Sequence, residues 1–309
     1  MKQNGKYYIA TNDVETTSIV NNNLSDKTGM LVLEEGLPLL LELYAQYNVK
    51  TTFFFTGYIA EKFPEVVRLV LPYGHEVGSH GYTHDVNMAF DMLSLEEQKE
   101  HLKKSKTILE DLSGQEVISF RAPAARTNKY TATALAETGF KIDSSIASQR
   151  FDFFLSFGSR QKLNWLKAPR VPYFTKEDSL WEKGNGPILE IPISAFIMPY
   201  IGTTMRLFPL LTTLLRNLLA VESSFNKKPI VFLTHPNEFI NEEYYNKQNR
   251  RSKSLLGYIV GDIIRRRLKV KNLGEDALPL YNRELDFFKR KKFSFVTCKE
   301  YYNHYLDRR

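Results

Sequence analysis

Segments of strand type alternate with segments of helix type along most of this chain. The strand-like segments are rich in β-branched and aromatic residues and lie at 7–12, 50–57, 75–80, 116–123, 140–145, 188–194 and 229–235. Helical patterns fill much of the sequence between them, at 32–48, 59–74, 94–114, 129–139 and 207–221. Because such alternation is typical of parallel sheets covered by helices, we predict an α/β fold whose sheet is either open or closed into a barrel.

Ionisable side chains stand where several of the predicted strands end. In α/β barrels the C-terminal strand ends and the loops after them build the active site. A core strand ordinarily ends in Gly, Asn or Ser, so a repeated ionisable ending indicates an active site at that edge of the sheet. The residues concerned are Asp13, Glu15, His80, Arg121, Asp143 and His235.

Two histidines four residues apart, His80 and His84, suggest a metal site in the stretch "GHEVGSHGYTHD". Two imidazoles and one carboxylate from the first strand can hold a divalent cation and leave a position open for water. By itself this spacing also fits a polar surface loop. We expect His75 to be structural, and His101 and His304 to be exposed to solvent.

These residue types suit the hydrolysis of an amide. A bound divalent cation lowers the pKa of a water molecule toward about 7 and polarises a carbonyl group. A carboxylate can take the remaining proton, and an acid must protonate the nitrogen because an amide anion cannot leave. No nucleophilic serine or cysteine is required for this chemistry.

Five short motifs, in this order, resemble those of the polysaccharide deacetylase (NodB-homology) family. They are "NDVE", "SHGYTH", "FRAPAA", "DSS" and "FLTHP", and the resemblance covers residues 7 to 240. It is nearest to the branch whose first motif reads Asp-Val-acid, which includes lipid-linked aminosugar deformylases. The resemblance implies a distorted (β/α) barrel and the metal-dependent removal of an N- or O-acyl group from a sugar.

The resemblance also implies a role for each motif residue. Asp13 would be the general base, His235 the general acid, and Arg121 would orient Asp13. Asp143 would hold Arg121, and the backbone N–H of Ala124 would bind the oxyanion. The metal, with zinc as the first candidate, would be bound by Glu15, His80 and His84.

The chain departs from the family pattern at two positions. The carboxylate ligand is usually Asp, so Glu15 adds a methylene group, and Asp13 could be the ligand instead. Many members have a Tyr where this chain has Ala124, which keeps the backbone N–H but loses any side-chain contact with the acyl group.

We predict a single catalytic domain over residues 1–309, with the motifs in 7–240 and a basic, helical part in 241–309 that closes the barrel. The net charge is +7, and basic residues gather at 246–253, 265–271 and 289–292. These clusters fit solvated helix faces, an anionic membrane or a phosphate-bearing substrate. We expect no nucleic acid as a partner, because no recognition motif accompanies the charge.

Two further segments bear on the substrate. The aromatic residues of 151–174 could stack on sugar rings or pack in the core, and the nearly apolar segment 205–221 could be a buried helix or lie on a bilayer. The single cysteine and the absence of an apolar signal core near residue 1 predict a cytoplasmic enzyme that visits the inner membrane face. Its expected substrate is an acylated aminosugar, either carried on a lipid phosphate or part of an envelope-glycan precursor, or else a soluble sugar.

Three other functions compete with this interpretation. A basic membrane- or nucleic-acid-binding protein without enzymatic activity would not need polar residues at five strand ends. A hydrolase of small cyclic amides could use the same scaffold and the same metal. A catalytically silent sugar-binding relative would ordinarily have lost a ligand, the base or the acid, and this chain has kept all of them.

Overall fold

A computed structural model describes residues 5–21, 23–149, 164–242, 268 and 270–308, and confirms the predicted α/β fold. The strands are β1 (Tyr7–Val14), β2 (Thr52–Phe55), β3 (Glu76–Ser79), β4 (Ser119–Phe120), β5 (Ile142–Asp143), β6 (Tyr173–Lys176), β7 (Ser179–Lys183), β8 (Leu189–Glu190), β9 (Ala195–Phe196), β10 (Met198–Pro199), β11 (Ile230–Thr234) and β12 (Ser294–Phe295). All seven predicted strands form, as β1, β2, β3, β4, β5, β8 and β11, although several are shorter than their apolar segments.

One mixed sheet forms the body of the domain, with the strand order β11-β1-β2-β3-β4-β5-β8-β6-β7. The pairs from β11 to β8 are parallel, whereas β6 is antiparallel to both β8 and β7. Ser194, just after β8, donates its backbone N–H to Val231 O on β11 at 3.1 Å, and the N–H of Val231 donates to the Ser194 hydroxyl at 3.0 Å. These two bonds join the first strand of the order to the chain leaving β8, and they close the sheet into a distorted barrel.

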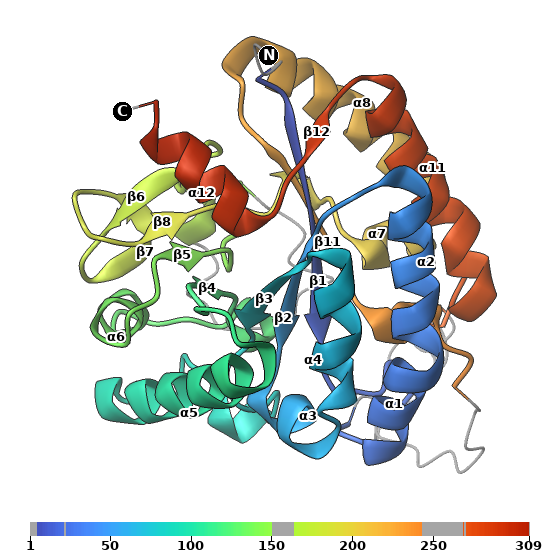
Figure 1. Cartoon of the computed structure of the whole chain (residues 1–309). Coiled ribbons are helices and arrows are strands. Elements are labelled where there is room, and N and C mark those ends of the chain that lie inside the picture. Colours follow the sequence, from blue (N-terminus) through green and yellow to red (C-terminus); the bar gives the residue numbers. More distant parts are fainter. Residues whose placement is uncertain (1–4, 22, 150–163, 243–267, 269, 309) are drawn as a thin grey trace, which may run out of the picture.

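Helices surround this sheet, and in Figure 1 α2, α4 and α11 lie outside the strands. The helices over the first half of the chain are α1 (Asp26–Leu31), η1 (Val32–Gly36), α2 (Leu37–Tyr47), α3 (Gly57–Lys62), α4 (Glu65–Val70), η2 (Leu71–Tyr73), η3 (Val86–Met88), α5 (Leu95–Ser113), η4 (Pro123–Ala125) and α6 (Thr131–Glu137). Those over the second half are α7 (Gly202–Leu207), α8 (Pro209–Asn226), η6 (Pro236–Phe239), η8 (Gly274–Asp276), α11 (Ala277–Arg290) and α12 (Cys298–Leu306).

Helix α5 shows how local sequence sets these elements. Ser94 and Glu97 form a reciprocal capping box at its start, and Gly114 ends it in the left-handed conformation. Its apolar residues Leu102 and Leu109 are fully buried. The helix therefore begins and ends where the sequence predicts.

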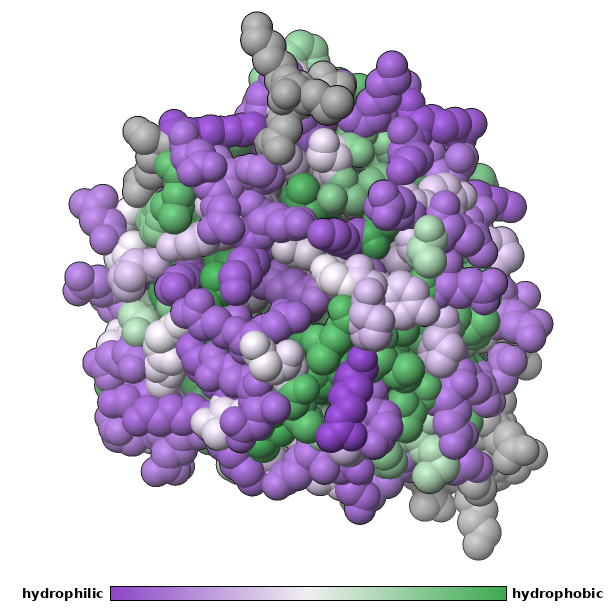
Figure 2. Space-filling model, viewed as in Figure 1, coloured by the Kyte–Doolittle hydropathy of each residue, from purple (hydrophilic) through white to green (hydrophobic). Residues whose placement is uncertain are grey.

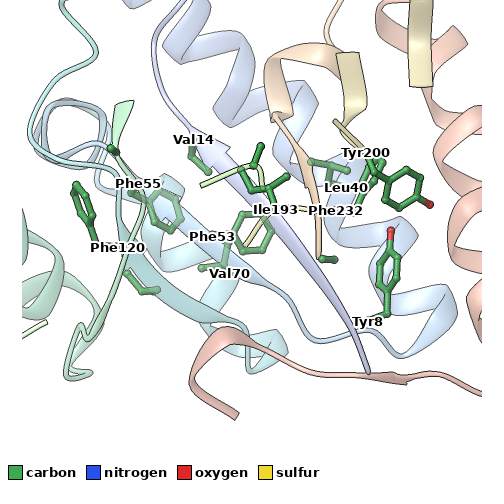
Figure 3. Packing of buried hydrophobic residues seen from close by; sticks show 14 of the residues in the cluster. Tyr8, Val14, Leu40, Phe53, Phe55, Val70, Phe120, Ile193, Tyr200 and Phe232 are labelled. Carbon is green, nitrogen blue, oxygen red and sulfur yellow. The ribbon is translucent and has the colours of Figure 1, made fainter. Parts of the chain in front are cut away.

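The core fills the space between the sheet and its helices. Phe53 and Phe55 of β2 point toward the helices with Val70 and Leu40, and Phe232 of β11 lies beside Tyr200 (Figure 3). All of these side chains are fully buried. Because β1 and β11 are fixed by this packing, the residues at their C-terminal ends are held on a rigid base.

Several predictions are corrected or fall outside the described residues. His101 is buried between Tyr82 and Phe90 rather than exposed, and His304 stacks on Tyr7. The segment 205–221 covers the end of α7 and most of α8, and α8 has one buried and one exposed apolar face, so it is not a fully buried helix. Phe151, Phe153, Phe154 and Phe157, and the basic clusters at 246–253 and most of 265–271, lie outside the described residues.

No helix among the described residues is both long enough and apolar enough to cross a membrane.

Candidate active site

The C-terminal ends of β1, β3, β4 and β11 meet around a cavity of about 150 Å³. The polar side of its lining comes from the residues that the sequence singled out, and the other side is apolar. The polar lining consists of Asp13, His80, His84, Arg121 and His235, and the apolar lining of Ala124, Ala125, Ala147, Trp165, Ile193, Pro199, Ile201 and Leu233. The structure therefore brings together residues from four strand ends that are far apart in the sequence.

His80 is held in one tautomer by its surroundings. Its Nδ1 lies 2.8 Å from the backbone oxygen of Arg121, and because a carbonyl can only accept, Nδ1 carries the proton. The Nε2 lone pair then faces the carboxylates of Asp13, at 3.8 Å, and Glu15, at 4.0 Å. Burial lowers the pKa of His80, which keeps the ring neutral. A neutral imidazole oriented through its second nitrogen is what a metal ligand requires.

Glu15 and His84 face each other as two acceptors. The backbone N–H of Ala124 donates to His84 Nε2 at 3.1 Å, so this nitrogen is unprotonated, and burial lowers the pKa of His84 to about 4. Glu15 Oε2 lies 3.1 Å from the same nitrogen and accepts no hydrogen bond from any described residue. Two acceptor atoms this close are stabilised when a cation or a proton lies between them.

The donor set therefore fits a divalent cation. Ligand atoms of Glu15, His80 and His84 all lie within 4.8 Å of one another, and Glu15 and His80 are buried. One carboxylate oxygen and two imidazole nitrogens form a set that zinc accepts with an open coordination position.

Asp13 lies beside this cluster and is bound by Arg121. Arg121 Nη1 donates to Asp13 Oδ1 at 2.9 Å, and Asp13 Oδ2 lies 3.8 Å from His80 Nε2. Burial by itself would raise the pKa of Asp13, but the charge of the Arg121 guanidinium and its hydrogen bond act against burial, and the pKa of Asp13 lies below its ordinary value. Asp13 is therefore ionised and able to accept a proton.

The expected partner of Arg121 is revised. Its guanidinium donates to Ser144, through Nε to the backbone oxygen at 2.7 Å and through Nη2 to the hydroxyl at 2.8 Å. Asp143 instead accepts from the Ser145 hydroxyl at 2.6 Å and interacts with Glu190, while Arg121 acts on it only through charge. Burial, and then the charge of Asp143, raise the pKa of Glu190 well above its ordinary value, so Glu190 is protonated beside Asp143.

His235 also lies near Asp13, with its Nε2 3.9 Å from Asp13 Oδ2, the same oxygen that His80 faces. The loop that carries it is anchored by buried Glu238, whose Oε2 accepts from the Thr234 hydroxyl at 2.7 Å and from the His235 backbone N–H at 3.4 Å. The other oxygen of Glu238 accepts from Arg206 Nε at 3.1 Å. The position of His235 thus depends on a buried ion pair.

The segment that carries the expected oxyanion donor has a strained backbone. Ala124 and Ala125 both have positive φ, at 50° and 51°, which is uncommon for residues other than glycine. This conformation aims the Ala124 N–H into the site, where it reaches His84 Nε2. Strain of this kind persists where the surrounding structure requires it, and it is common at active sites.

Three supporting residues escaped sequence reasoning. Thr11 accepts from Arg121 Nη1 at 2.8 Å, Ser144 accepts twice from the same guanidinium, and Glu238 anchors the loop of His235. Thr11 could have been found from the alternation of β1, because residues 11, 13 and 15 share one face. No local signal identified Glu238 as a partner of Arg206.

The aromatic segment contributes one described residue to the cavity. Trp165 is buried and lines the apolar wall, whereas Tyr173 and Phe174 pack in the core of β6. Of the two alternatives for these rings, packing in the core holds for Tyr173 and Phe174.

Comparison with known proteins relates this chain to carbohydrate deacetylases. Residues 24–142 match the family model for polysaccharide deacetylase. A peptidoglycan deacetylase of Helicobacter pylori is 32% identical over 155 residues, which is 50% of this chain and 45% of that protein. A peptidoglycan-N-acetylglucosamine deacetylase of Bacillus cereus is 37% identical over 89 residues, 29% of this chain and 31% of that protein. The chain thus spans less than half the length of these relatives.

The fold is also found among solved structures. A Pseudomonas aeruginosa protein described as a probable polysaccharide deacetylase superposes with a TM-score of 0.57 over 96% of this chain and 90% of its own, at 17% identity. At that identity the likeness establishes the fold alone.

Proposed function

We propose, from the premise that the chain belongs to the polysaccharide deacetylase family, that it is a metal-dependent hydrolase of an N-acylated aminosugar. The acyl group would be acetyl or formyl. The observation that carries the proposal is the cluster of Glu15, His80 and His84, flanked by an ionised carboxylate on Asp13 and by His235. The proposed base Asp13, the proposed acid His235 and two of the three proposed ligands, His80 and His84, line one cavity.

The proposed roles follow from the contacts. A divalent cation, with zinc as the first candidate, would be held by Glu15, His80 and His84 and would supply Lewis acidity to the site. Asp13 takes a proton from the attacking water, and Arg121 keeps Asp13 ionised and oriented. A general base contributes roughly 10²–10⁴-fold to the rate of a proton transfer.

The departing amine and the oxyanion need their own partners. His235, partly exposed at the cavity rim, donates a proton to the nitrogen, since an amide anion cannot leave. The Ala124 N–H points into the site and would donate to the oxyanion once it is released from His84 Nε2. One such donor is worth about 3 kcal/mol in the transition state.

The substrate is inferred from the size and lining of the cavity. About 150 Å³ beside an apolar wall of Ala147, Ile193 and Trp165 accommodates a small acyl group, with the sugar outside it. The curated relatives are named for peptidoglycan, which supports a cell-envelope glycan or its precursor. We propose such a glycan, with a lipid-linked aminosugar as the narrower possibility, and place the enzyme in the cytoplasm.

The test is an acyl-release assay with zinc-loaded protein. An N-acetylglucosamine oligosaccharide, its lipid-linked counterpart and an N-formyl analogue are compared, with acetate or formate and the new free amine measured together. The Asp13→Asn variant should lose release, while Met92→Asp, a change of an exposed residue outside the cavity lining, should not. If the protein hydrolyses a cyclic amide such as hydantoin but releases no acyl group from any aminosugar, it is a cyclic-amide hydrolase. If it binds the sugar but releases no acyl group, it is a catalytically silent relative.

A further inference from the structure

Helix α8 exposes a continuous apolar face on the surface. Leu210, Leu214, Leu218, Val221 and Phe225 follow one another at intervals of four, four, three and four residues, so they share one side of the helix. Leu210 is 89% exposed and Phe225 is 84% exposed. These five residues, with the half-exposed Leu211, are called the α8 outer face.

This face lacks the polar residues that a surface helix ordinarily presents to water. The opposite side of α8 packs on the domain through Leu215 and Leu219, so the helix is anchored without using the outer face. The other exposed positions on α8, such as Thr213 and Asn217, are uncharged or lie at its C-terminal end. A contiguous exposed apolar surface of this kind marks an interaction site more often than chance exposure.

Among the described residues, the two acidic side chains that form ion pairs at α8, Glu222 and Glu284, are both matched by cations. Glu222 of α8 pairs with Arg170 and Lys228, and Glu284 of α11 pairs with Arg216 of α8. Both acidic groups are thus neutralised. Exposed Lys227 stands at the C-terminal end of α8, and exposed Lys271 contacts the backbone of Leu207 just before its N-terminal end.

We propose that the α8 outer face docks the protein on an anionic lipid bilayer. The apolar side chains would enter the interfacial region, and Lys227 and Lys271 would lie at the level of the headgroups. In a two-fold dimer through the same face, each of these lysines would lie opposite a lysine of the second copy. Like charges would then meet at both ends of the helix. An anionic bilayer instead offers opposite charge at both ends of the helix.

Docking would place the cavity near the bilayer surface. Ile201 lines the cavity, α7 follows directly, and α8 begins two residues after α7 ends. The exposed apolar residues Phe196 and Ile197 of the β9–β10 hairpin lie in the same part of the chain, and the Arg170 guanidinium covers the Phe196 ring at 5.4 Å. This proposal does not rest on the proposed reaction, since it concerns binding alone.

The experiment is vesicle co-sedimentation of the full chain. Vesicles of phosphatidylglycerol and phosphatidylcholine are compared with pure phosphatidylcholine, at low and high salt. Leu214→Asp, at a position 55% exposed in the free protein, should weaken partition by about tenfold or more, because it removes a Leu that docking would bury in the bilayer and adds a negative charge that anionic lipid repels. Met92→Asp is the matched control: it is 62% exposed and precedes α5, which lies across the molecule from α8 in Figure 1.

The outcomes separate the possible occupants of this face. Binding to the anionic vesicles that Leu214→Asp weakens and Met92→Asp leaves unchanged supports the proposal. Equal loss in both variants would mean that net charge, rather than α8, governs binding and would overturn it. A concentration-dependent dimer in light scattering that Leu214→Asp abolishes, without vesicle binding, would assign the face to a second copy. Turnover of a free oligosaccharide is measured alongside, so that a failed docking proposal is not mistaken for a failed enzyme.

Discussion

Arg121 donates a hydrogen bond of 2.9 Å from Nη1 to Oδ1 of Asp13, and both side chains are almost completely buried. The same guanidinium also donates to Thr11 and twice to Ser144. Asp13 therefore sits in a fixed orientation beside the proposed ligands, and its charge is compensated without water.

Replacing Arg121 by Lys should damage both stability and rate. A lysine ammonium cannot reproduce the planar fork that reaches Asp13 and Ser144 together, so at least one buried acceptor is left unpaired. We expect a loss of about 2–4 kcal/mol in the free energy of unfolding and a fall in kcat of roughly 10–100-fold. Urea unfolding and acyl-release kinetics measure the two effects.

The Thr11→Val variant is the control for the Arg121 experiment, since it removes a single neutral acceptor and should cost about 1 kcal/mol. A Lys variant with wild-type kcat would show that the orientation of Asp13 is unimportant.

His235 as general acid predicts a dependence on the leaving group. An amide nitrogen must be protonated, whereas a phenolate leaves without help. His235→Ala should therefore lower kcat on an N-acetyl substrate by roughly 10²–10⁴-fold and on an aryl acetate far less. Equal losses on the two substrates would mean that His235 serves binding rather than proton transfer.

How much of this site could be read from the sequence depended on which interactions are local. Strand ends could be located because apolar alternation and turn residues mark them. Their positions predicted that Asp13, His80, Arg121 and His235 lie at one edge of the sheet. The contact between Arg121 and Ser144 could not be predicted from the sequence, because it joins two loops whose relative rotation is set by the whole barrel. The exposed face of α8 was also hidden, since a helix that is apolar on nearly all sides carries no periodic signal for its buried face.

The arrangement of residues on the surface is equally hard to predict from the sequence, as Figure 2 illustrates. Hydrophilic residues dominate the face shown there, and hydrophobic ones lie between them. Amino-acid composition does not show whether exposed hydrophobic residues form a patch, because scattered exposed apolar residues are normal. Only the arrangement of the helices distinguishes the α8 outer face from such scatter.

Gly202 should be intolerant of a side chain. A Cβ at this position would lie 1.9 Å from Glu238 Oε2 and 2.8 Å from Thr234 Oγ1, so the buried carboxylate would have to move away from Arg206. We expect Gly202→Ala to lower the free energy of unfolding by about 2–4 kcal/mol and to reduce activity through His235.

Gly114→Ala provides the comparison for Gly202→Ala. Gly114 has positive φ but open space around it, so its replacement by Ala should lower the free energy of unfolding by only about 1 kcal/mol. Thermal or urea unfolding of the two variants measures the difference, and equal losses would mean that the Glu238 contact carries no special weight.

His75 should make stability fall as the solution is acidified. Burial lowers its pKa from 6.5 to about 4, and its Nδ1 accepts the backbone N–H of Thr51. Between these two values the unfolded chain binds more protons than the folded chain, so stability rises with pH across this window and is lost as pH falls through it. The full effect is on the order of 3 kcal/mol.

The measurement is the difference between wild type and His75→Gln in the free energy of urea unfolding from pH 7.5 to pH 4.5, roughly the window that the shifted pKa defines. Other groups titrate equally in both proteins, so the difference isolates His75. Parallel curves would show that folding leaves the pKa of His75 unchanged.

The metal content of purified variants tests the central claim most directly. After zinc loading and extensive dialysis, elemental analysis should find one metal ion per chain in the wild type and in Asp13→Asn, and none in Glu15→Ala or in the His80→Ala, His84→Ala double variant. Circular dichroism should show that all of these proteins are folded. Full metal occupancy in the double histidine variant would contradict the account, and loss of metal in Asp13→Asn with retention in Glu15→Ala would exchange the roles of the two carboxylates.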